Sequence, residues 1–411
     1  MATQVSPMSR KPCITDVGVL ALVPDRWKAF WETRHFILTG LSEYFPVVWC
    51  NPPYSRQDFW KNSVDSDFGQ DISFFPGLNV YQPKRWLPNI GRPSFLGHWM
   101  GKSRLKNARN LLAAQGCRKL IIYLWRPNFK VALDLMDYDL SCYHIDDDYT
   151  LLDSDQELQG LIETEREIAS RVDQVFVTSP GLLAKKGQFN PHTLFVPNGV
   201  DYDLFATPWT EPEDLAPIPH PRVGYVGMIK QQLNLPLLLD LARRNRDLSF
   251  VLVGPRRLHE EVTSFITELL RLPNVYILGP KPLEALPRYQ QHMDVSVLCY
   301  KVNEYTNCVY PLKLHQYLAS GIPVIGSRIR SLVDFVSVLD IADTADEWDL
   351  CIKNALLRVN DIERKAVKRR ELAKQYDWKY LVEKIAYRLC LRLGGSYPER
   401  FQNEVHKSRI G

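Results

Sequence analysis

The sequence contains no long hydrophobic run. Its apolar stretches, such as residues 17–23, are far shorter than the roughly 18–20 apolar residues that cross a bilayer, so no transmembrane helix is predicted. The opening residues, MATQVSPMSRKPC, also lack the apolar core of a signal peptide. We therefore expect neither a membrane-spanning segment nor export.

Paired cysteine motifs are also missing. None of the eight cysteines forms a CxxC pair, which argues against a zinc site and against a disulfide framework. Scattered cysteines of this kind are typical of reduced thiols in the cytoplasm. The cysteines stand at positions 13, 50, 117, 142, 299, 308, 351 and 390.

Acidic residues are absent from residues 72–133, although the net charge of the whole chain is only +4. Cations mixed with large apolar groups favour an anionic membrane surface. A solvated basic face and a nucleic-acid site are the alternatives, and nucleic acid is not the expected partner. The residues predicted to contact membrane or acceptor are Lys84, Arg85, Trp86, Lys102, Arg104 and Lys106.

Composition and periodicity indicate an α/β protein. With 411 residues, 45% of them hydrophobic and 24% charged, the chain is globular and long enough for two domains. Short buried strands alternate with helical patterns, which is typical of doubly wound parallel sheets. Strands are predicted at residues 14–23, 47–53, 119–125, 140–145, 174–179, 222–227, 249–254, 274–279, 295–300 and 323–327. Helices are predicted at 31–45, 235–245, 259–272, 283–292, 311–321 and 374–393.

A proline-rich segment interrupts this alternation. Residues 206–222, ATPWTEPEDLAPIPHPR, hold five prolines and no periodic pattern, so we predict an interdomain linker there. The predicted domains are residues 1–205 and 223–375, both Rossmann-like, followed by a C-terminal helix and tail at 376–411.

The stretch YPLKLHQYLASGIPVIGS, residues 310–327, reads as a helix that leads into a strand. Pro311 suits the first helical turn, and Gly321 with Pro323 ends the helix. Lys313 and Gln316 lie three residues apart, so they share one polar face.

Four stretches resemble signature motifs of GT-B glycosyltransferases. They are VPNGVDYDLF at 196–205, VGYVGMI at 223–229, SFVLVGP at 249–255 and PLKLHQYLASGIPVIGS at 311–327. ETRHFI and CYHIDDDYT narrow the likeness to family 4-like bacterial enzymes of the teichuronic-acid and exopolysaccharide type. The resemblance implies two Rossmann-like domains with a cleft between them, and a final helix that crosses back to the first domain. It also implies a nucleotide-diphosphate sugar, expected to be a UDP-sugar, on the C-terminal domain and an acceptor on the N-terminal domain.

One departure from the family pattern leaves the stereochemical outcome open. Most family 4 enzymes carry two glutamates seven residues apart, whereas Cys308 and Gln316 stand at the matching positions here. The Lys-x-x-Gln pair is similar to the nucleotide site of the xanthan glucuronosyltransferase, so Lys313 and Gln316 are predicted to bind the donor. A surface face on a core helix is the structural alternative.

The loop GMIKQQ follows the first strand of the second predicted domain. Backbone N–H groups after Gly227 and Met228 could approach a diphosphate, with Lys230 as a point charge. A simple tight turn at Gly227 is the alternative.

The stretch HIDDDYT, residues 144–150, follows a predicted strand at its carboxyl end. Asp146, Asp147 and Asp148 could supply a general base for an acceptor hydroxyl, since neighbouring carboxylates raise one another's pKa. Turn formation or helix capping is the alternative. A metal is possible for three carboxylates, but the resemblance implies metal-independent transfer and no cofactor.

Arg34 and His35 begin the helix that follows the first predicted strand. In the resembling family this position faces the cleft, which makes Arg34 a donor-binding candidate and His35 a catalytic one. A buried structural histidine is the alternative.

The expected function is transfer of a hexosyl or glycuronosyl group to a polyprenyl-linked or glycan acceptor, at the inner face of the cytoplasmic membrane. A non-catalytic GT-B-like nucleotide-binding scaffold and a GT-B sugar epimerase are the alternatives.

Overall fold

The computed structural model describes residues 11–27, 31–53, 72–84, 94–151, 155–257, 260–357 and 359–410. The chain divides into two compact units. Unit 1 comprises Met1–Val196 and Lys379–Gly411, and unit 2 comprises Pro197–Trp378. The chain passes between the units at Val196 and again at Trp378, and the proline-rich segment 206–222 lies within unit 2.

Unit 1 is built on a parallel seven-stranded sheet with the order β3-β2-β1-β4-β5-β6-β7. Its five central strands are short and almost wholly buried, as expected for a sheet that is covered on both faces, whereas the edge strands β3 and β7 are largely half-buried. The strands are β1 (Val17–Leu22), β2 (Val47–Cys50), β3 (Leu78–Tyr81), β4 (Lys119–Leu124), β5 (Leu140–Ile145), β6 (Gln174–Val177) and β7 (Thr193–Phe195). The helices are α1 (Thr33–Leu41), α2 (Ser94–Ala114), α3 (Ala132–Leu135), α4 (Asp155–Arg171), α5 (Pro180–Lys186), α14 (Trp378–Leu393) and α15 (Tyr397–Ile410).

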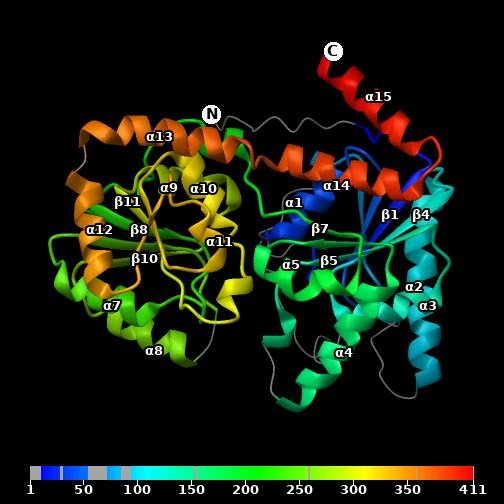
Figure 1. Ribbon diagram of the computed structural model, residues 1–411, viewed down its shortest axis with the longest axis horizontal. Helices are drawn as coiled ribbons and strands as arrows, with labels where there is room; N and C mark the ends of the chain where they lie inside the picture. The colour runs from blue at the N-terminus through cyan, green and yellow to red at the C-terminus, as the bar shows by residue number, and fades with distance from the viewer. Residues whose placement is uncertain are drawn as a thin grey trace. The chain divides into compact units, whose positions relative to one another are not determined.

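Helices cover both faces of this sheet. Figure 1 shows α1 and α14 on one face and α2 to α5 on the other. Gly40 of α1 lies directly against Val382 of α14, where any larger side chain would collide. The final helix α15 is fastened to the start of β1, because the Arg400 guanidinium donates to both carboxylate oxygens of Asp16 at 3.0 and 2.8 Å. The C-terminal helices are therefore part of unit 1.

Unit 2 contains a parallel six-stranded sheet with the order β10-β9-β8-β11-β12-β13. The strands are β8 (Arg222–Val226), β9 (Ser249–Val253), β10 (Val275–Gly279), β11 (Val295–Leu298), β12 (Val324–Gly326) and β13 (Asp340–Ile341). The helices are α6 (Tyr202–Ala206), α7 (Leu235–Arg244), α8 (Glu260–Leu269), α9 (Leu286–Gln291), α10 (Lys313–Ser320), α11 (Arg330–Val333), α12 (Ala345–Leu357) and α13 (Val359–Lys374). In this unit α9, α10 and α13 lie on one face of the sheet, and α7 and α8 on the other (Figure 1).

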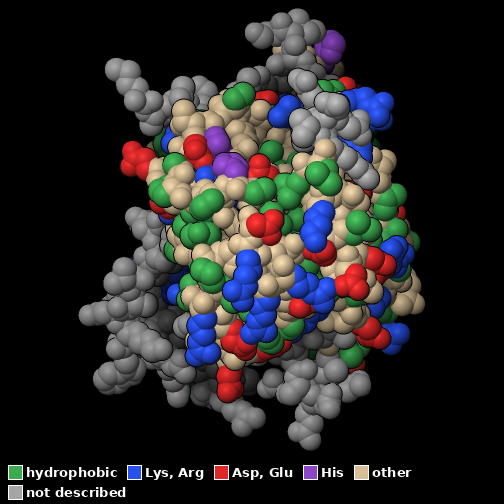
Figure 2. All heavy atoms as spheres, turned by 90° about the vertical axis from the view of Figure 1, so that its left-hand side faces the viewer, with side chains coloured by type: hydrophobic (Ala, Val, Ile, Leu, Met, Phe, Trp, Pro, Cys, Tyr) green, Lys and Arg blue, Asp and Glu red, His purple; other side chains and the backbone are tan. Residues whose placement is uncertain are grey.

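Charges of both signs are interspersed on the face of unit 2 that Figure 2 presents. Arg244 pairs with Asp346 at 2.5 Å and with Asp240 at 2.8 Å, and Lys353 pairs with Asp349 at 2.6 Å. This balanced surface differs from α2 in unit 1, which contains no acidic residue.

In both sheets the strand order reverses beside the first strand, between β1 and β4 in unit 1 and between β8 and β11 in unit 2. Doubly wound sheets bind their ligands outside the carboxyl ends of the strands at such a switch point. Functional side chains are therefore expected at these two strand ends.

Candidate functional site

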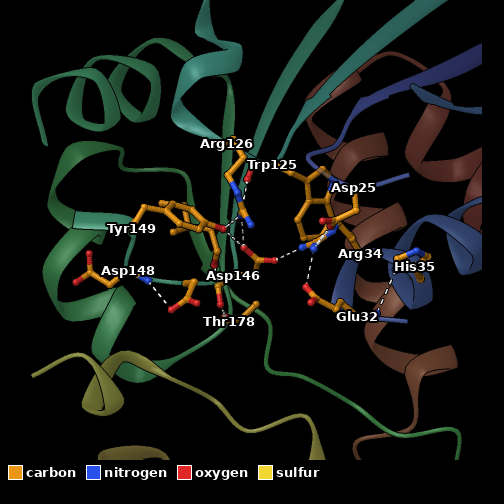
Figure 3. Close-up of polar contacts among 12 residues, drawn as sticks. Asp25, Glu32, Arg34, His35, Trp125, Arg126, Asp146, Asp148, Tyr149 and Thr178 are labelled. Carbon is orange, nitrogen blue, oxygen red and sulfur yellow. Dashed lines mark hydrogen bonds and ion pairs between the residues drawn. The ribbon is translucent and has the colours of Figure 1, made fainter. Parts of the chain in front are cut away.

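In unit 1, charged side chains converge just beyond the carboxyl ends of β1, β4 and β5. Asp25 follows β1, Arg126 follows β4 and Asp146 follows β5. Figure 3 shows these three residues pointing toward one another around Arg34, which comes from the start of α1. This cluster stands at the switch point of the sheet, where the fold places a ligand.

Arg34 is the centre of the cluster and is only 2% exposed. Its guanidinium donates to Asp146 Oδ2 at 2.9 Å and to Glu32 Oε2 at 2.5 Å, and it also pairs with Asp25. The neighbouring carboxylates raise the pKa of Arg34 against the effect of burial, which lowers it. A buried cation held by three carboxylates keeps its charge and fixes the positions of all three.

The carboxylate of Asp146 is occupied on both sides. Oδ2 accepts from Arg34, and Oδ1 accepts from Arg126 at 3.0 Å and contacts the Tyr149 hydroxyl. The Arg126 guanidinium also lies 4.0 Å from the centre of the Tyr149 ring. Asp146 therefore positions two arginines at the edge of the sheet.

Asp147 and Asp148 have different surroundings. Asp148 is wholly buried, with Lys185 at 3.2 Å, Lys186 at 3.3 Å and the Thr150 hydroxyl donating at 2.6 Å. Burial opposes ionisation, but the hydrogen bond from Thr150 and the two lysines together lower the pKa of Asp148. Asp147 is half-buried, and its Oδ1 accepts from the Asp148 amide at 2.9 Å. Within the described part of the chain, no three His, Cys, Asp or Glu side chains gather as a metal site would require.

The structure places His35 in an aromatic cluster. The side chain is fully buried, its ring centre lies 4.6 Å from that of Trp49, and its Nδ1 accepts from the Glu32 amide at 3.1 Å. Burial, with Arg34 alongside, lowers the pKa of His35 to about 3. His35 is therefore neutral and caps the start of α1, next to Arg34 but not in its ion-pair network.

In unit 2, Gly227 and Lys313 are brought into contact. Gly227 directly follows β8 with φ of +150°, and a Cβ placed on it would lie 1.6 Å from Lys313 Cε. Only glycine leaves room for the lysine stem here, and glycine alone adopts this backbone conformation readily. The Lys313 ammonium group, 5.5 Å from the centre of the Tyr225 ring, is thus held over the carboxyl end of β8.

Tyr317 links α10 to the carboxyl end of β8 through two hydrogen bonds. Its hydroxyl accepts from the Val226 amide at 2.7 Å and donates to the Val226 carbonyl at 3.0 Å. The helix begins at Lys313 and ends at Gly321, whose φ is +81°. Gln316 is 6% exposed on this helix.

The other two donor candidates lie in the loop after β8. Met228 and Lys230 are both half-buried there, and the Met228 carbonyl accepts from the Tyr225 hydroxyl at 2.9 Å. Of the five donor candidates in unit 2, Gly227 and Lys313 are in contact with each other.

The basic stretch of unit 1 proves to be largely the helix α2. Lys102 and Lys106 are exposed on it, Arg104 is half-buried, and Lys84 is exposed in the segment after β3. Trp99, 59% exposed, shares a helical face with Lys102, Lys106 and Arg109. Arg85 and Trp86 lie outside the described residues.

Sequence reasoning did not single out Asp25, Glu32, Arg126, Tyr149 or Tyr317. Asp25 and Arg126 directly follow the predicted strands 14–23 and 119–125, so the rule that ligands bind at strand ends could have found both. Burial raises the pKa of Asp25 despite the nearby Arg34, so this carboxylate holds a proton more readily than Asp148 does.

No described helix is both long enough and apolar enough to cross a membrane.

Comparison with known proteins finds a family match within unit 2. Residues 220–347 match the family model described as glycosyl transferases group 1. This range contains β8 to β13 and the Gly227–Lys313 contact.

Relatives match over almost the whole chain. A protein of Bacillus subtilis (strain 168), provisionally assigned as the teichuronic acid biosynthesis glycosyltransferase TuaH, is 29% identical over 85% of this chain and 89% of its own. The Anabaena protein HepE, solved with UDP and glucose, has a TM-score of 0.67 at 15% identity, covering 91% of this chain and 99% of that chain. A sucrose-phosphate synthase from Thermosynechococcus elongatus has a TM-score of 0.65 at 16% identity, covering 90% and 97% of the two chains.

Proposed function

We propose that the chain is a glycosyltransferase of the GT-B fold that transfers a sugar from a UDP-sugar to a lipid-linked or glycan acceptor. The group 1 match in unit 2 and the matched relatives support this. The expected setting is the synthesis of bacterial cell-surface polysaccharide. The relative assigned to teichuronic acid biosynthesis supports this setting, and HepE, solved with UDP and glucose, supports the donor class.

The contact between Gly227 and Lys313 carries the proposal. A diphosphate at the carboxyl end of β8 would meet the backbone after Gly227 and the Lys313 ammonium group together. The first turn of α10 adds the positive end of its dipole. Gln316, one turn further along, could donate to or accept from the ribose hydroxyls.

The acceptor is proposed to bind at the charged edge of unit 1. Arg126 is 25% exposed there and offers a cation, while Asp25, Asp146 and Asp147 offer carboxylates. A general base of an inverting transfer must come within hydrogen-bond reach of the acceptor hydroxyl. We expect the transfer of a hexosyl or glycuronosyl group to need neither a resident cofactor nor a metal ion.

The protein is proposed to work at the anionic inner face of the cytoplasmic membrane. The cationic stripe of α2, Trp99 with Lys102, Lys106 and Arg109, supports this surface. Nucleic acid is not an expected partner.

Calorimetric titration with UDP, ADP and GDP tests the donor class. We expect UDP to bind most tightly, because the proposed donor is a UDP-sugar. Equal binding of all three nucleotides, or no binding of any, would contradict the proposal. Tight UDP binding without turnover on any acceptor would favour a scaffold, and conversion of a UDP-sugar without an acceptor would favour an epimerase.

A further inference from the structure

A largely apolar pocket adjoins the charged edge of unit 1 and plays no part in the ion-pair network. It lies at the carboxyl ends of β1, β2 and β3, which contribute Leu22, Cys50 and Tyr81. The helices α2 and α3 and the short helix Pro127–Val131 close it from the other side. The pocket has a volume of about 120 Å³ and is partly open to solvent.

The walls of the pocket offer little to a polar ligand. Among the described lining residues, Arg104 is the single charged one. Asn51 uses its amide group within the protein, because Oδ1 accepts from the Trp27 amide at 2.9 Å and Nδ2 donates to Gln82 at 2.9 Å. A ligand would therefore meet hydrocarbon on most sides and one guanidinium.

Arg104 gives the pocket its charge preference. It projects from α2 beside Tyr81, and burial lowers the pKa of the guanidinium. The whole segment from 72 to 133 contains no carboxylate. A phosphate attached to an apolar chain matches a cation beside an apolar pocket, since burial strengthens a charge-assisted hydrogen bond.

The helix that closes the pocket is also the one with the exposed cationic stripe. Leu105 faces inward and lines the pocket, whereas Lys102 and Lys106 on the same helix face solvent. Figure 1 shows α2 running along the edge of unit 1 beside α3. A lipid held at an anionic surface by this stripe would have its chain close to the pocket.

The pocket and the charged cluster lie next to each other at the carboxyl ends of the strands of unit 1. Val23 lines the pocket and Asp25 belongs to the cluster, while Phe129 lines the pocket and Arg126 belongs to the cluster. A ligand seated in the pocket would therefore lie next to the charged cluster. We propose that this pocket takes the prenyl chain of a prenyl phosphate or diphosphate, with Arg104 at the phosphate, as the lipid part of the acceptor. The assignment of this lipid to the acceptor rests on the proposed function.

Calorimetry with the full chain and farnesyl phosphate, below its micelle concentration, tests the site. We expect farnesyl phosphate to bind at least about tenfold more tightly than inorganic phosphate or dodecyl phosphate. Val131→Glu places a carboxylate at the pocket wall and should weaken farnesyl phosphate binding about tenfold or more. Val131 is 41% exposed, so the variant should fold.

Leu111→Glu is the matched control. Leu111 is 37% exposed, lies on α2, and does not line the pocket, so the variant makes the same change of charge elsewhere. Its affinity for farnesyl phosphate should stay within about twofold of the native value. Gly101→Leu is a second, uncharged variant, because a Cβ at Gly101 points at Leu135 of the pocket wall from 3.1 Å. This variant should also weaken binding.

Three results would overturn the proposal. The first is that the native protein does not bind farnesyl phosphate at all, and the second is that it binds farnesyl phosphate no more tightly than the Val131→Glu and Gly101→Leu variants do. The third is an affinity of the native protein for dodecyl phosphate that equals its affinity for farnesyl phosphate. Arg104→Gln should lower affinity for farnesyl phosphate about tenfold while leaving farnesol binding nearly unchanged. Equal losses for both ligands would remove Arg104 from the phosphate. Pocket-dependent binding without sugar transfer would contradict the proposed function alone, and sugar transfer without pocket-dependent binding would contradict this inference alone.

Discussion

At the scale of single residues, the closest packing in the proposed donor site is between a glycine and a lysine. Gly227 has no side chain, and the Lys313 stem fills the space that a Cβ would need. Glycine is required here both by its φ of +150° and by this contact. The lysine is therefore held in place before any nucleotide binds, which reduces the entropy that binding must overcome.

We expect Lys313→Ala to weaken UDP binding by about 1.5–3 kcal/mol, or roughly 10- to 150-fold, the range for a hydrogen bond to a charged group. Titration calorimetry on the folded variant measures this loss. Lys353→Ala is the control, since Lys353 is an exposed lysine of the same unit that pairs with Asp349. Unchanged affinity in the Lys313 variant would remove this residue from the donor site.

The carboxylates of unit 1 are expected to separate into structural and chemical roles. Asp148→Asn should destabilise unit 1 by about 2–3 kcal/mol, because Lys186 then keeps only Glu165 as a buried partner. Asp147→Asn should change stability by only about 0.5 kcal/mol, because Asp147 is half-buried. Urea denaturation of both variants measures the difference. Equal stability of the two would show that the pairing of Asp148 with lysine contributes little.

Single Asn variants of Asp25, Asp146 and Asp147 test for a general base. If Asp25, Asp146 or Asp147 accepts the acceptor proton, its Asn variant should bind UDP normally and lose about 10²–10⁴-fold in turnover. Turnover is measured at saturating donor after each variant has been checked for folding. Near-native turnover in all the Asn variants would exclude a carboxylate base at this edge.

At the scale of elements, periodicity predicted most strands of both sheets. It predicted six of the helices, α1, α7, α8, α9, α10 and α14, and missed the others. Each predicted strand from 14–23 to 323–327 overlaps a strand of the structure, because buried parallel strands are continuous apolar runs bounded by turns. The GT-B fold predicted from the motifs is confirmed by the two parallel sheets and the structural neighbours. The strands β3, β7 and β13 were missed, since strands of two to four residues are too short to stand out.

The helix α2 shows why part of the site could not be predicted. The basic and aromatic residues of this segment predicted a membrane-contacting surface, but no helix was predicted there. The apolar periodicity of the helix is weak, because Gly101 and Arg104 stand on the face that lines the pocket. The Arg34 cluster was partly predictable, since strand ends point to Asp25 and Asp146. The pairing of Arg34 with Asp146 joins residues 112 positions apart in sequence, which a single sequence does not reveal.

The cationic stripe of α2 should determine membrane affinity. Reversing Lys102, Lys106 and Arg109 to Glu should weaken binding to anionic vesicles by at least about 3 kcal/mol, since each cation near such a surface contributes about 1 kcal/mol. Raised salt should weaken native binding in the same assay. Vesicle sedimentation measures both effects.

A matched control reverses three exposed cations of unit 2, Arg271, Lys353 and Lys368. The control should sediment with anionic vesicles as the native protein does. If the two triple variants lost binding equally, net charge rather than the stripe would explain it. Tighter binding of the native protein to duplex DNA than to vesicles would favour a nucleic-acid partner.

At the scale of the whole molecule, three buried histidines make stability depend on pH. Burial lowers the pKa of His35, His144 and His315 to about 3 each. The unfolded chain protonates them near pH 6.5, so it binds more protons than the folded protein between about pH 6.5 and 3. Their contribution to stability is complete above pH 6.5 and is lost as the pH falls through this window.

Each histidine should therefore add up to about 1.4 kcal/mol per pH unit to the slope of unfolding free energy between pH 6.5 and 5. His144→Gln should lower that slope by about this amount, whereas the exposed His406→Gln should leave it unchanged. Chemical denaturation at several pH values measures the slopes. Identical slopes for native protein and the His144 variant would mean that this imidazole is protonated in the fold.

Sugar transfer itself is the most direct test of the account. The full chain is incubated with radiolabelled UDP-sugars and polyprenyl-diphosphate-linked or glycan acceptors, and labelled product is separated by chromatography. We predict transfer from at least one UDP-sugar, slowed about tenfold or more at subsaturating donor by Lys313→Ala and unaffected by Lys353→Ala. Thermal stabilisation by UDP with no labelled product from any donor and acceptor pair would contradict the account.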